Sequence, residues 1–155
     1  MFKIFLNQIP NAPLLLSIGV VFPFVLLSAG LWFLPYEYKL LALYNLLNYS
    51  VIILSFIGAV HWGVAITKGI KSYKHYLIAI TPALLSWFML IGFFANYIVI
   101  LIFFLLAFLT MFFIDMHYTK SGFFPVWYLP LRKLVSIIVI ISIGLATIAV
   151  NIKVL

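Results

Sequence analysis

The sequence contains no cysteine among its 155 residues. Disulfide bonds, thiolate metal sites and cysteine nucleophiles are therefore excluded. Charged residues make up only 7% of the chain and only two residues, Glu37 and Asp115, are acidic, whereas about 25% of the residues in soluble domains are charged. The chain also lacks a serine-nucleophile motif, a phosphate-binding loop and paired histidines at helical spacing. These absences argue against the common classes of enzyme.

Hydrophobic residues, by contrast, make up 68% of the chain, against about 45–50% in soluble domains. A soluble domain of this size buries only about 70% of its surface, so it could not hide this much apolar area from water. The composition therefore predicts an integral membrane protein. The length predicts a single domain, residues 1–155, with no separate soluble domain.

Five apolar runs have the length of about 20 residues that a helix needs to cross about 30 Å of hydrocarbon. Backbone polar groups in lipid must be satisfied within their own segment, so these runs are predicted to be helices. Barrel strands would be shorter and would alternate in hydrophobicity. The sequence thus predicts an all-α bundle of five transmembrane helices. The predicted spans are residues 13–34, 40–66, 76–94, 97–115 and 131–151.

The positive side chains are distributed unevenly between the predicted loops. With five spans, seven cations lie on the side of the N-terminus and two on the other side. Cytoplasmic loops carry the excess of lysine and arginine, so we expect a cytoplasmic N-terminus and a C-terminus on the opposite side. The expected location is the bacterial cytoplasmic (inner) membrane, or the mitochondrial inner membrane in a eukaryote. The seven are Lys3, Lys68, Lys71, Lys74, Lys120, Arg132 and Lys133, and the two are Lys39 and Lys153.

The net charge of +7 is accordingly interpreted as a sign of membrane topology. The cations are divided among short loops and form no continuous basic face, which argues against nucleic acid as a partner. The expected partner is the lipid bilayer, including its anionic headgroups. Short loops leave mainly helix faces for protein contacts, so another membrane protein or a second copy of this chain is the expected protein partner.

A histidine, His61, lies within the apolar stretch "SFIGAVHWG" of the second predicted span. Ser55, Ala59 and Gly63 recur every four residues on one helix face, while Gly58 and Ala65 flank His61 on another. Small residues in such rows let neighbouring helices approach closely, so the second span is predicted to be central in the bundle. His61 then forms an interhelical hydrogen bond, or else serves as a proton relay or as a metal or haem ligand.

Asp115 and Arg132 lie at the depth of His61 on the same predicted side. Asp115 is expected to close the fourth span and Arg132 to open the fifth, where each opposes the helix dipole. Pairing Asp115 with Arg132 would offset both penalties. His61, Asp115 and His117 could supply metal ligands, but none of them has the helical spacing typical of a site, so no metal and no cofactor are predicted. The predicted polar cluster comprises His61, Trp62, Asp115, His117, Trp127, Tyr128 and Arg132.

Two further features are mainly structural. Pro23 and Pro82 are expected to kink the first and third spans. Aromatic residues follow the fourth span and predict an interfacial belt, or alternatively a segment that covers the polar groups. These aromatic residues are Phe123, Phe124, Trp127 and Tyr128.

The elements "LSFIGAVHWG", "PALLSW" and "PVWYLPLRK" resemble the bacterial and mitochondrial family known as domain of unknown function 3429, the family of human mitochondrial transmembrane protein 69. The resemblance covers nearly the whole chain. It implies a small inner-membrane protein and assigns no chemistry to any residue. The family's characteristic positions correspond here to His61, Trp62, Gly63, Pro82, Trp87, Asp115, Pro125, Trp127, Tyr128 and Arg132.

Three classes of function follow from these observations. A non-enzymatic accessory or assembly partner of a larger membrane complex is favoured, because the short loops leave little room for soluble chemistry. A transporter or channel-like protein is one alternative, although the chain has no evident inverted repeat. A membrane redox or metal-binding protein that uses the region of His61, Asp115 and His117 is the other.

Overall fold

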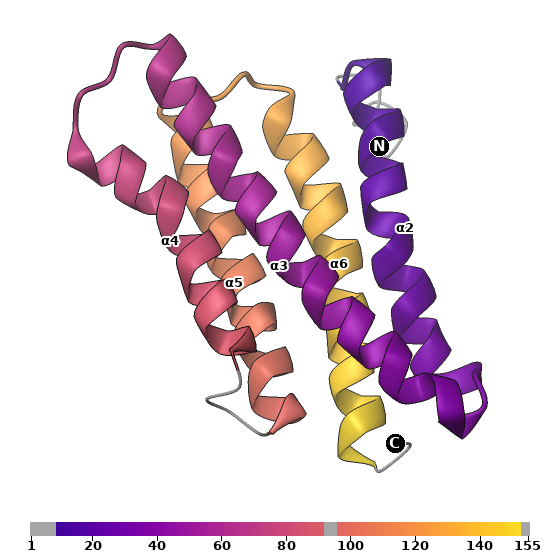
Figure 1. The fold of residues 1–155 in the computed structure, drawn as a ribbon. Coiled ribbons are helices and arrows are strands. Elements are labelled where there is room, and N and C mark those ends of the chain that lie inside the picture. The colour runs from indigo at the N-terminus through magenta and orange to yellow at the C-terminus, as the bar shows by residue number, and fades with distance from the viewer. Residues whose placement is uncertain (1–8, 92–95, 153–155) are drawn as a thin grey trace.

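The computed structural model describes residues 9–91 and 96–152, which form five helices joined by short connections (Figure 1). The all-α prediction is confirmed. The helices are α2 (Asn11–Phe33), α3 (Tyr36–Thr67), α4 (Tyr73–Leu90), α5 (Tyr97–Lys120) and α6 (Tyr128–Asn151).

Four of these helices, α2, α3, α5 and α6, are long and apolar enough to cross a membrane. The helix α4 has 18 residues and begins with the polar run Tyr73, Lys74 and His75, so within the described residues it does not reach that standard. The last residues of the predicted third span, 92–94, lie outside the described part of the chain.

The helix α3 begins at Tyr36 rather than at residue 40. Pro35 precedes it with φ −54° and ψ 149°, a conformation that proline adopts readily at a helix start. Glu37 lies in the first turn, where a carboxylate interacts favourably with the helix dipole. The connection from α2 is therefore only Leu34 and Pro35, so the helix begins four residues before the predicted second span.

The helix α5 continues past Asp115 to Lys120, and α6 begins at Tyr128 rather than at residue 131. Gly122 ends α5 with φ 76°, a left-handed conformation that glycine adopts without strain. The Phe123 N–H donates to the Tyr118 carbonyl at 2.8 Å, as at many glycine-terminated helix ends. The prediction that Asp115 closes the helix is wrong because the first residue suited to terminate it is Gly122.

The connections 68–72 and 121–127 lie at the same end of the molecule as the start of α2 (Figure 1). We call this end the basic end, because six of the seven cations predicted for one side lie in or beside these connections. Lys39 lies at the opposite end, near the start of α3, and Lys3 and Lys153 fall outside the described residues. The uneven charge seen in the sequence is thus present in the fold.

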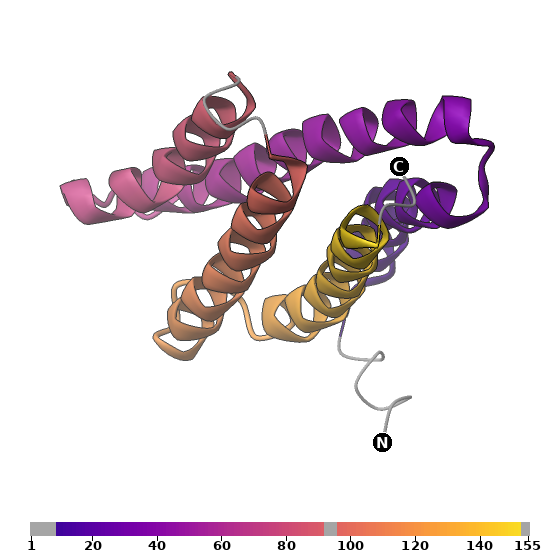
Figure 2. The same cartoon turned by 90° about the horizontal axis from the view of Figure 1, so that it is seen from below.

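The helix α3 contacts α2, α4 and α5, and α6 contacts α2 and α5. Seen from below, α3 runs obliquely across the molecule, with α5 and α6 on one side of it (Figure 2). Large apolar side chains fill the interior. The fully buried ones include Phe24, Leu43, Leu54, Phe104 and Ile143.

Two hydrogen bonds join α2 to its neighbours. Ser28 Oγ donates to the Ser142 carbonyl at 2.7 Å, and Tyr49 Oη donates to the Val20 carbonyl at 2.9 Å. Val20 lies in the turn before Pro23, where the missing proline N–H weakens the helical hydrogen bonding. A neighbouring helix therefore supports the backbone beside this proline, as expected in lipid.

The closest approach of α3 to α4 is at Gly58. A Cβ placed on Gly58 would lie 2.1 Å from the carbonyl oxygen of Ala79, whereas one placed on Gly63 would meet nothing within 4 Å. Ala59 and Gly63 are exposed, and Ser55 is half-buried. Of the predicted packing residues Ser55, Gly58, Ala59 and Gly63, Gly58 lies at this contact, whereas Ala59 and Gly63 lie on an outward face of α3 within the chain.

Candidate functional site

Three ionisable side chains meet inside the basic end, each from a different helix. His61 comes from α3, Asp115 from α5 and Arg132 from α6. His61 Nε2 lies 2.7 Å from Asp115 Oδ1, and Arg132 Nε donates to Asp115 Oδ2. Asp115 is completely buried, and His61 and Arg132 are 1% and 6% exposed. We call these three residues the ionic cluster.

The predicted pairing of Asp115 with Arg132 is present, but the helix dipoles explain it only in part. Asp115 lies more than one turn before the end of α5, and Arg132 lies one turn inside α6. Their interaction with the helix dipoles is therefore weak, because that effect fades within the terminal turn. The stronger cause is burial: a charge removed from water requires a partner, and Asp115 has one on each carboxylate oxygen.

The rings of Tyr118, Phe123 and Phe124 cover the histidine of the ionic cluster. We call these three rings the aromatic cover. The ring centroid of His61 lies 4.9 Å from that of Phe124, 5.4 Å from that of Tyr118 and 6.3 Å from that of Phe123. Phe123 and Phe124 are 8% and 3% exposed. These two rings therefore form no interfacial belt, and the alternative interpretation, a segment that covers the polar groups, describes them correctly.

The connection 121–127 is held in place by contacts to α3 and α4. Lys68 Nζ donates to the Gly122 carbonyl at 2.8 Å and lies 5.3 Å from the centre of the Phe123 ring, within the range of a cation–π interaction. The His75 ring stacks on Phe123, with centroids 5.4 Å apart and planes at 22°. The connection is thus anchored from both helices.

Three predicted site residues lie beside the ionic cluster rather than in it. Tyr128 is half-buried, and its ring centroid is 4.4 Å from that of Phe124. Trp127 is half-buried with its ring 6.3 Å from that of Tyr128. Trp62 is 41% exposed and packs against Tyr76. Tyr128 therefore supports the aromatic cover, while Trp62 belongs to the contact between α3 and α4.

His117 does not join the ionic cluster. It is exposed, and residues two apart on an intact helix do not share a face. Because α5 stays helical to Lys120, His117 points away from Asp115. The grouping of His61, Asp115 and His117 as metal ligands is therefore wrong, and the described residues contain no group of three such side chains that could hold a metal ion.

Sequence reasoning missed His75 and a groove between α4 and α5. His75 lies in the first turn of α4, where no pattern distinguishes it from its polar neighbours. The groove is lined in part by Ala107 and Thr110, and these small residues in the otherwise bulky middle of α5 are a signal in the sequence that could have indicated it. Arg132 Nη2 is also buried without a hydrogen-bond partner in the described structure, so the guanidinium is anchored through Nε.

A family model described as "Protein of unknown function (DUF3429)" matches residues 9–148. The chain belongs to this family. Neither curated proteins nor solved structures give a match. The matched region of this DUF3429 chain contains all of the ionic cluster and its aromatic cover. Membership confirms the resemblance seen in the sequence and, together with the four long apolar helices, supports a membrane protein.

Proposed function

We propose that this protein is a non-enzymatic accessory or assembly partner of a larger inner-membrane complex. The observation that carries the proposal is that the ionic cluster is buried and internally paired. Both oxygens of Asp115 are engaged, one near His61 Nε2 and one by Arg132 Nε. A general base must reach the proton that it removes from its substrate, whereas Asp115 is completely buried behind these two partners. The arrangement therefore suits a contact that holds three helices together better than a reaction centre. We call the ionic cluster in this structural role the clamp.

The clamp acts on the surface of the basic end. It joins α3, α5 and α6 at one point, and the aromatic cover ties the connection 121–127 to that point. Lys68 links the same connection to the end of α3. Two short connections are thereby held in one shape, and a fixed surface of this kind is what a partner protein binds with the smallest loss of conformational entropy.

The proposal includes a topology. The basic end faces the cytoplasm, or the matrix in a mitochondrion, because it carries the excess of lysine and arginine. The helix α4 completes a fifth crossing, which places the C-terminus on the opposite side. Reporter fusions after Leu155 should be active outside the cytoplasm, and fusions at Lys71 inside. A C-terminal reporter active only in the cytoplasm would contradict both the five crossings and this orientation.

The accessory role is tested by comparing two histidine variants expressed at native level. His61→Gln removes the ring under the aromatic cover, whereas His117→Gln changes an exposed histidine at the same end of the molecule. Extracts in mild detergent are separated by native electrophoresis, and the bands are analysed by mass spectrometry. We expect the wild-type protein and His117→Gln to migrate in one larger complex, and His61→Gln to leave that complex while keeping its helical content.

Two outcomes would contradict parts of the proposal. One is a folded His61→Gln protein that stays in the complex at the wild-type level, which would leave the accessory role but show that the clamp does not shape the partner surface. The other is a protein that migrates alone and, when purified, carries stoichiometric metal or haem that His61→Ala releases. That second result would favour the redox alternative.

A further inference from the structure

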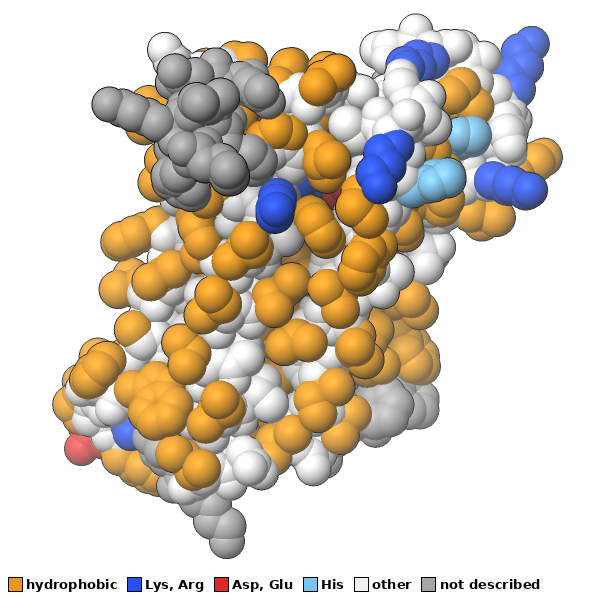
Figure 3. All heavy atoms as spheres, turned by 180° about the vertical axis from the view of Figure 1, so that it is seen from behind, with side chains coloured by type: hydrophobic (Ala, Val, Ile, Leu, Met, Phe, Trp, Pro, Cys, Tyr) orange, Lys and Arg blue, Asp and Glu red, His pale blue; other side chains and the backbone are white. Residues whose placement is uncertain are grey.

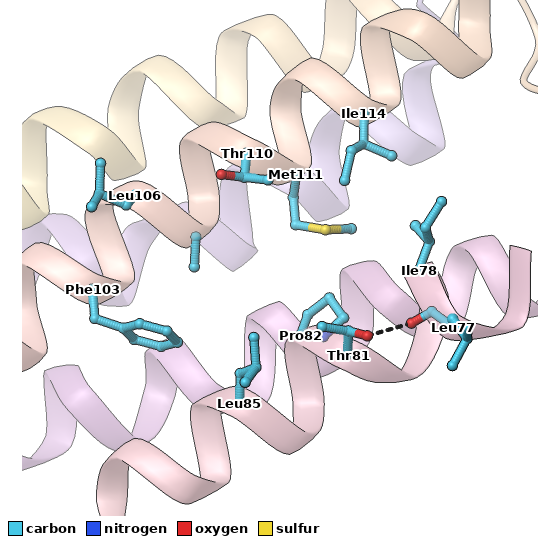
Figure 4. A pocket seen from close by; sticks show the side chains of 11 residues that line it. Leu77, Ile78, Thr81, Pro82, Leu85, Phe103, Leu106, Thr110, Met111 and Ile114 are labelled. Atoms are coloured by element: carbon cyan, nitrogen blue, oxygen red, sulfur yellow. Dashed lines mark hydrogen bonds between the residues drawn. The ribbon is translucent and has the colours of Figure 1, made fainter. Parts of the chain in front are cut away.

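As well as a pocket of about 570 Å³ between α2 and α6, the molecule has open space between α4 and α5. A pocket of about 370 Å³ lies between them, within the usual size range of sites for small molecules. Figure 4 shows side chains of the two helices facing each other across it, with Ile78 and Leu85 from α4 and Phe103 and Ile114 from α5. A second pocket shares Ile78, Thr110 and Ile114 with the first and reaches His117. Together they form one groove, the α4–α5 groove.

The walls of the α4–α5 groove suit a hydrocarbon chain. The side chains that line its first pocket are apolar except for Thr81 and Thr110. Thr81 Oγ1 donates to the Leu77 carbonyl at 2.6 Å, so this hydroxyl is satisfied within its own helix (Figure 4). A groove of this composition gains from apolar contact and offers few partners for a polar ligand.

The mouth of the groove at the basic end is positively charged. Lys74 lies one turn before Leu77 and Ile78 on α4, and Lys120 lies one turn after His117 on α5, so each lysine shares a helix face with residues of the groove wall. Lys74, His117 and Lys120 are all exposed. Figure 3 shows lysine and histidine side chains gathered at this end above a largely hydrophobic surface.

Acidic side chains do not neutralise this mouth. The sequence has two, of which Asp115 is buried and paired within the ionic cluster and Glu37 lies at the opposite end of the molecule. The groove thus combines an apolar channel with cations at one end. A ligand that complements both has an acyl chain and a negatively charged headgroup.

We infer that the α4–α5 groove binds an acyl chain of an anionic phospholipid, whose headgroup is held at the basic end by Lys74, His117 and Lys120. The occupant is a lipid rather than free phosphate, because the cations stand at the end of an apolar groove. This inference is independent of the partner proposed above, since it depends on the opposite face of α5.

The test uses the full chain in nanodiscs that contain phosphatidylcholine and phosphatidylglycerol, followed by native mass spectrometry of the lipids retained after release into detergent. The wild-type protein should retain phosphatidylglycerol in preference to phosphatidylcholine. Lys74→Gln combined with Lys120→Gln should weaken that retention by about fivefold for each lysine, the contribution expected of a cation near an anionic membrane surface. Lys39→Gln combined with Lys133→Gln removes the same charge elsewhere and should leave retention unchanged.

A second pair of variants tests the groove itself. Ala107→Phe fills the α4–α5 groove without a change of charge and should abolish the retained phosphatidylglycerol. Ala59→Phe places the same ring on an exposed face of α3 and should retain it. Circular dichroism of each variant checks that the helices are intact.

Three results would overturn the inference. Equal retention of both lipids would show that the headgroup is not selected. Displacement of the lipid by glycerol phosphate alone would show that the acyl chain does not contribute. A dimer that Ala107→Phe dissociates would show that the groove is occupied by a second copy of the chain.

Discussion

The two faces of α5 at the basic end place polar side chains in opposite environments, one buried and one exposed. Asp115 turns inward, is completely buried and is paired with Arg132 and His61. His117, two residues further on, is exposed at the mouth of the α4–α5 groove. One helix therefore carries a closed ionic contact on one side and an open, positively charged groove on the other. Because the ionic contact is buried, this contact stabilises the fold, whereas the exposed groove does not.

The same contrast appears in how α4 is held. On one side, Gly58 brings α3 against the backbone of Ala79, so closely that a Cβ would not fit. On the other side, α4 and α5 contact each other little and leave a groove. The position of α4 is thus set by its contact with α3. The loose contact between α4 and α5 leaves the α4–α5 groove open. Three pairs of measurements, taken from the largest expected effect to the smallest, sharpen this comparison.

Removing the charge of Asp115 should have the largest effect. Asp115→Asn leaves Arg132, which is 6% exposed, buried without its counter-ion, and breaking a buried pair in this way costs about 3–5 kcal/mol. The matched control is Glu37→Gln, which removes the other acidic side chain at an exposed position and should change stability by at most about 0.5 kcal/mol. Unfolding free energies in mixed micelles check both values. Equal effects of the two variants would contradict a clamp at Asp115.

Adding a methyl group to α3 should have a smaller effect that depends on the face. Gly58→Ala forces the helices apart at Ala79 and should destabilise the protein by about 1–3 kcal/mol, as overpacking does. Gly63→Ala meets open space and should be neutral or stabilising by up to about 1 kcal/mol, because alanine favours the helix. The same unfolding assay distinguishes them. A tolerated Gly58→Ala would mean that α4 is not held at this point.

Coupling energies should separate the two faces of α5. A double-mutant cycle of Asp115→Asn with Arg132→Gln should give a coupling above the roughly 0–1 kcal/mol of an exposed pair. The cycle of Asp115→Asn with His117→Gln should be additive within about 0.5 kcal/mol, because these side chains share no partner. Additivity in the first cycle would show that Asp115 and Arg132 do not act together.

The pairing of Asp115 could be predicted because the sequence offers so few alternatives. A chain with two acidic residues and 68% hydrophobic residues leaves a carboxylate in lipid with only a few cations to meet. The position of His117 could not be predicted in the same way. It depended on where α5 ends, and that in turn depended on the left-handed backbone of Gly122 rather than on the hydropathy of the span.

The packing face of α3 was ambiguous for a different reason. The helix has small residues both in the row of Ser55, Ala59 and Gly63 and at Gly58, and each is compatible with close helix packing. Only the position of the Ala79 carbonyl shows that Gly58 is the contact. The α4–α5 groove was also hard to predict, because the small residues Ala107 and Thr110 mark only one of its walls and the groove depends on the spacing of two helices.

The most direct test of the clamp is a distance between the two connections that it holds. The chain has no cysteine, so Thr67→Cys and Ser121→Cys, both at exposed positions, can be spin-labelled without background. The contact of Lys68 with the Gly122 carbonyl places these connections side by side, and continuous-wave electron paramagnetic resonance should show strong spin–spin broadening. We expect the broadening to persist in His117→Gln and to disappear in His61→Gln and Asp115→Asn while the helices remain. Unchanged broadening in a folded Asp115→Asn protein would contradict the account, because the basic end would then keep its shape without the ionic cluster.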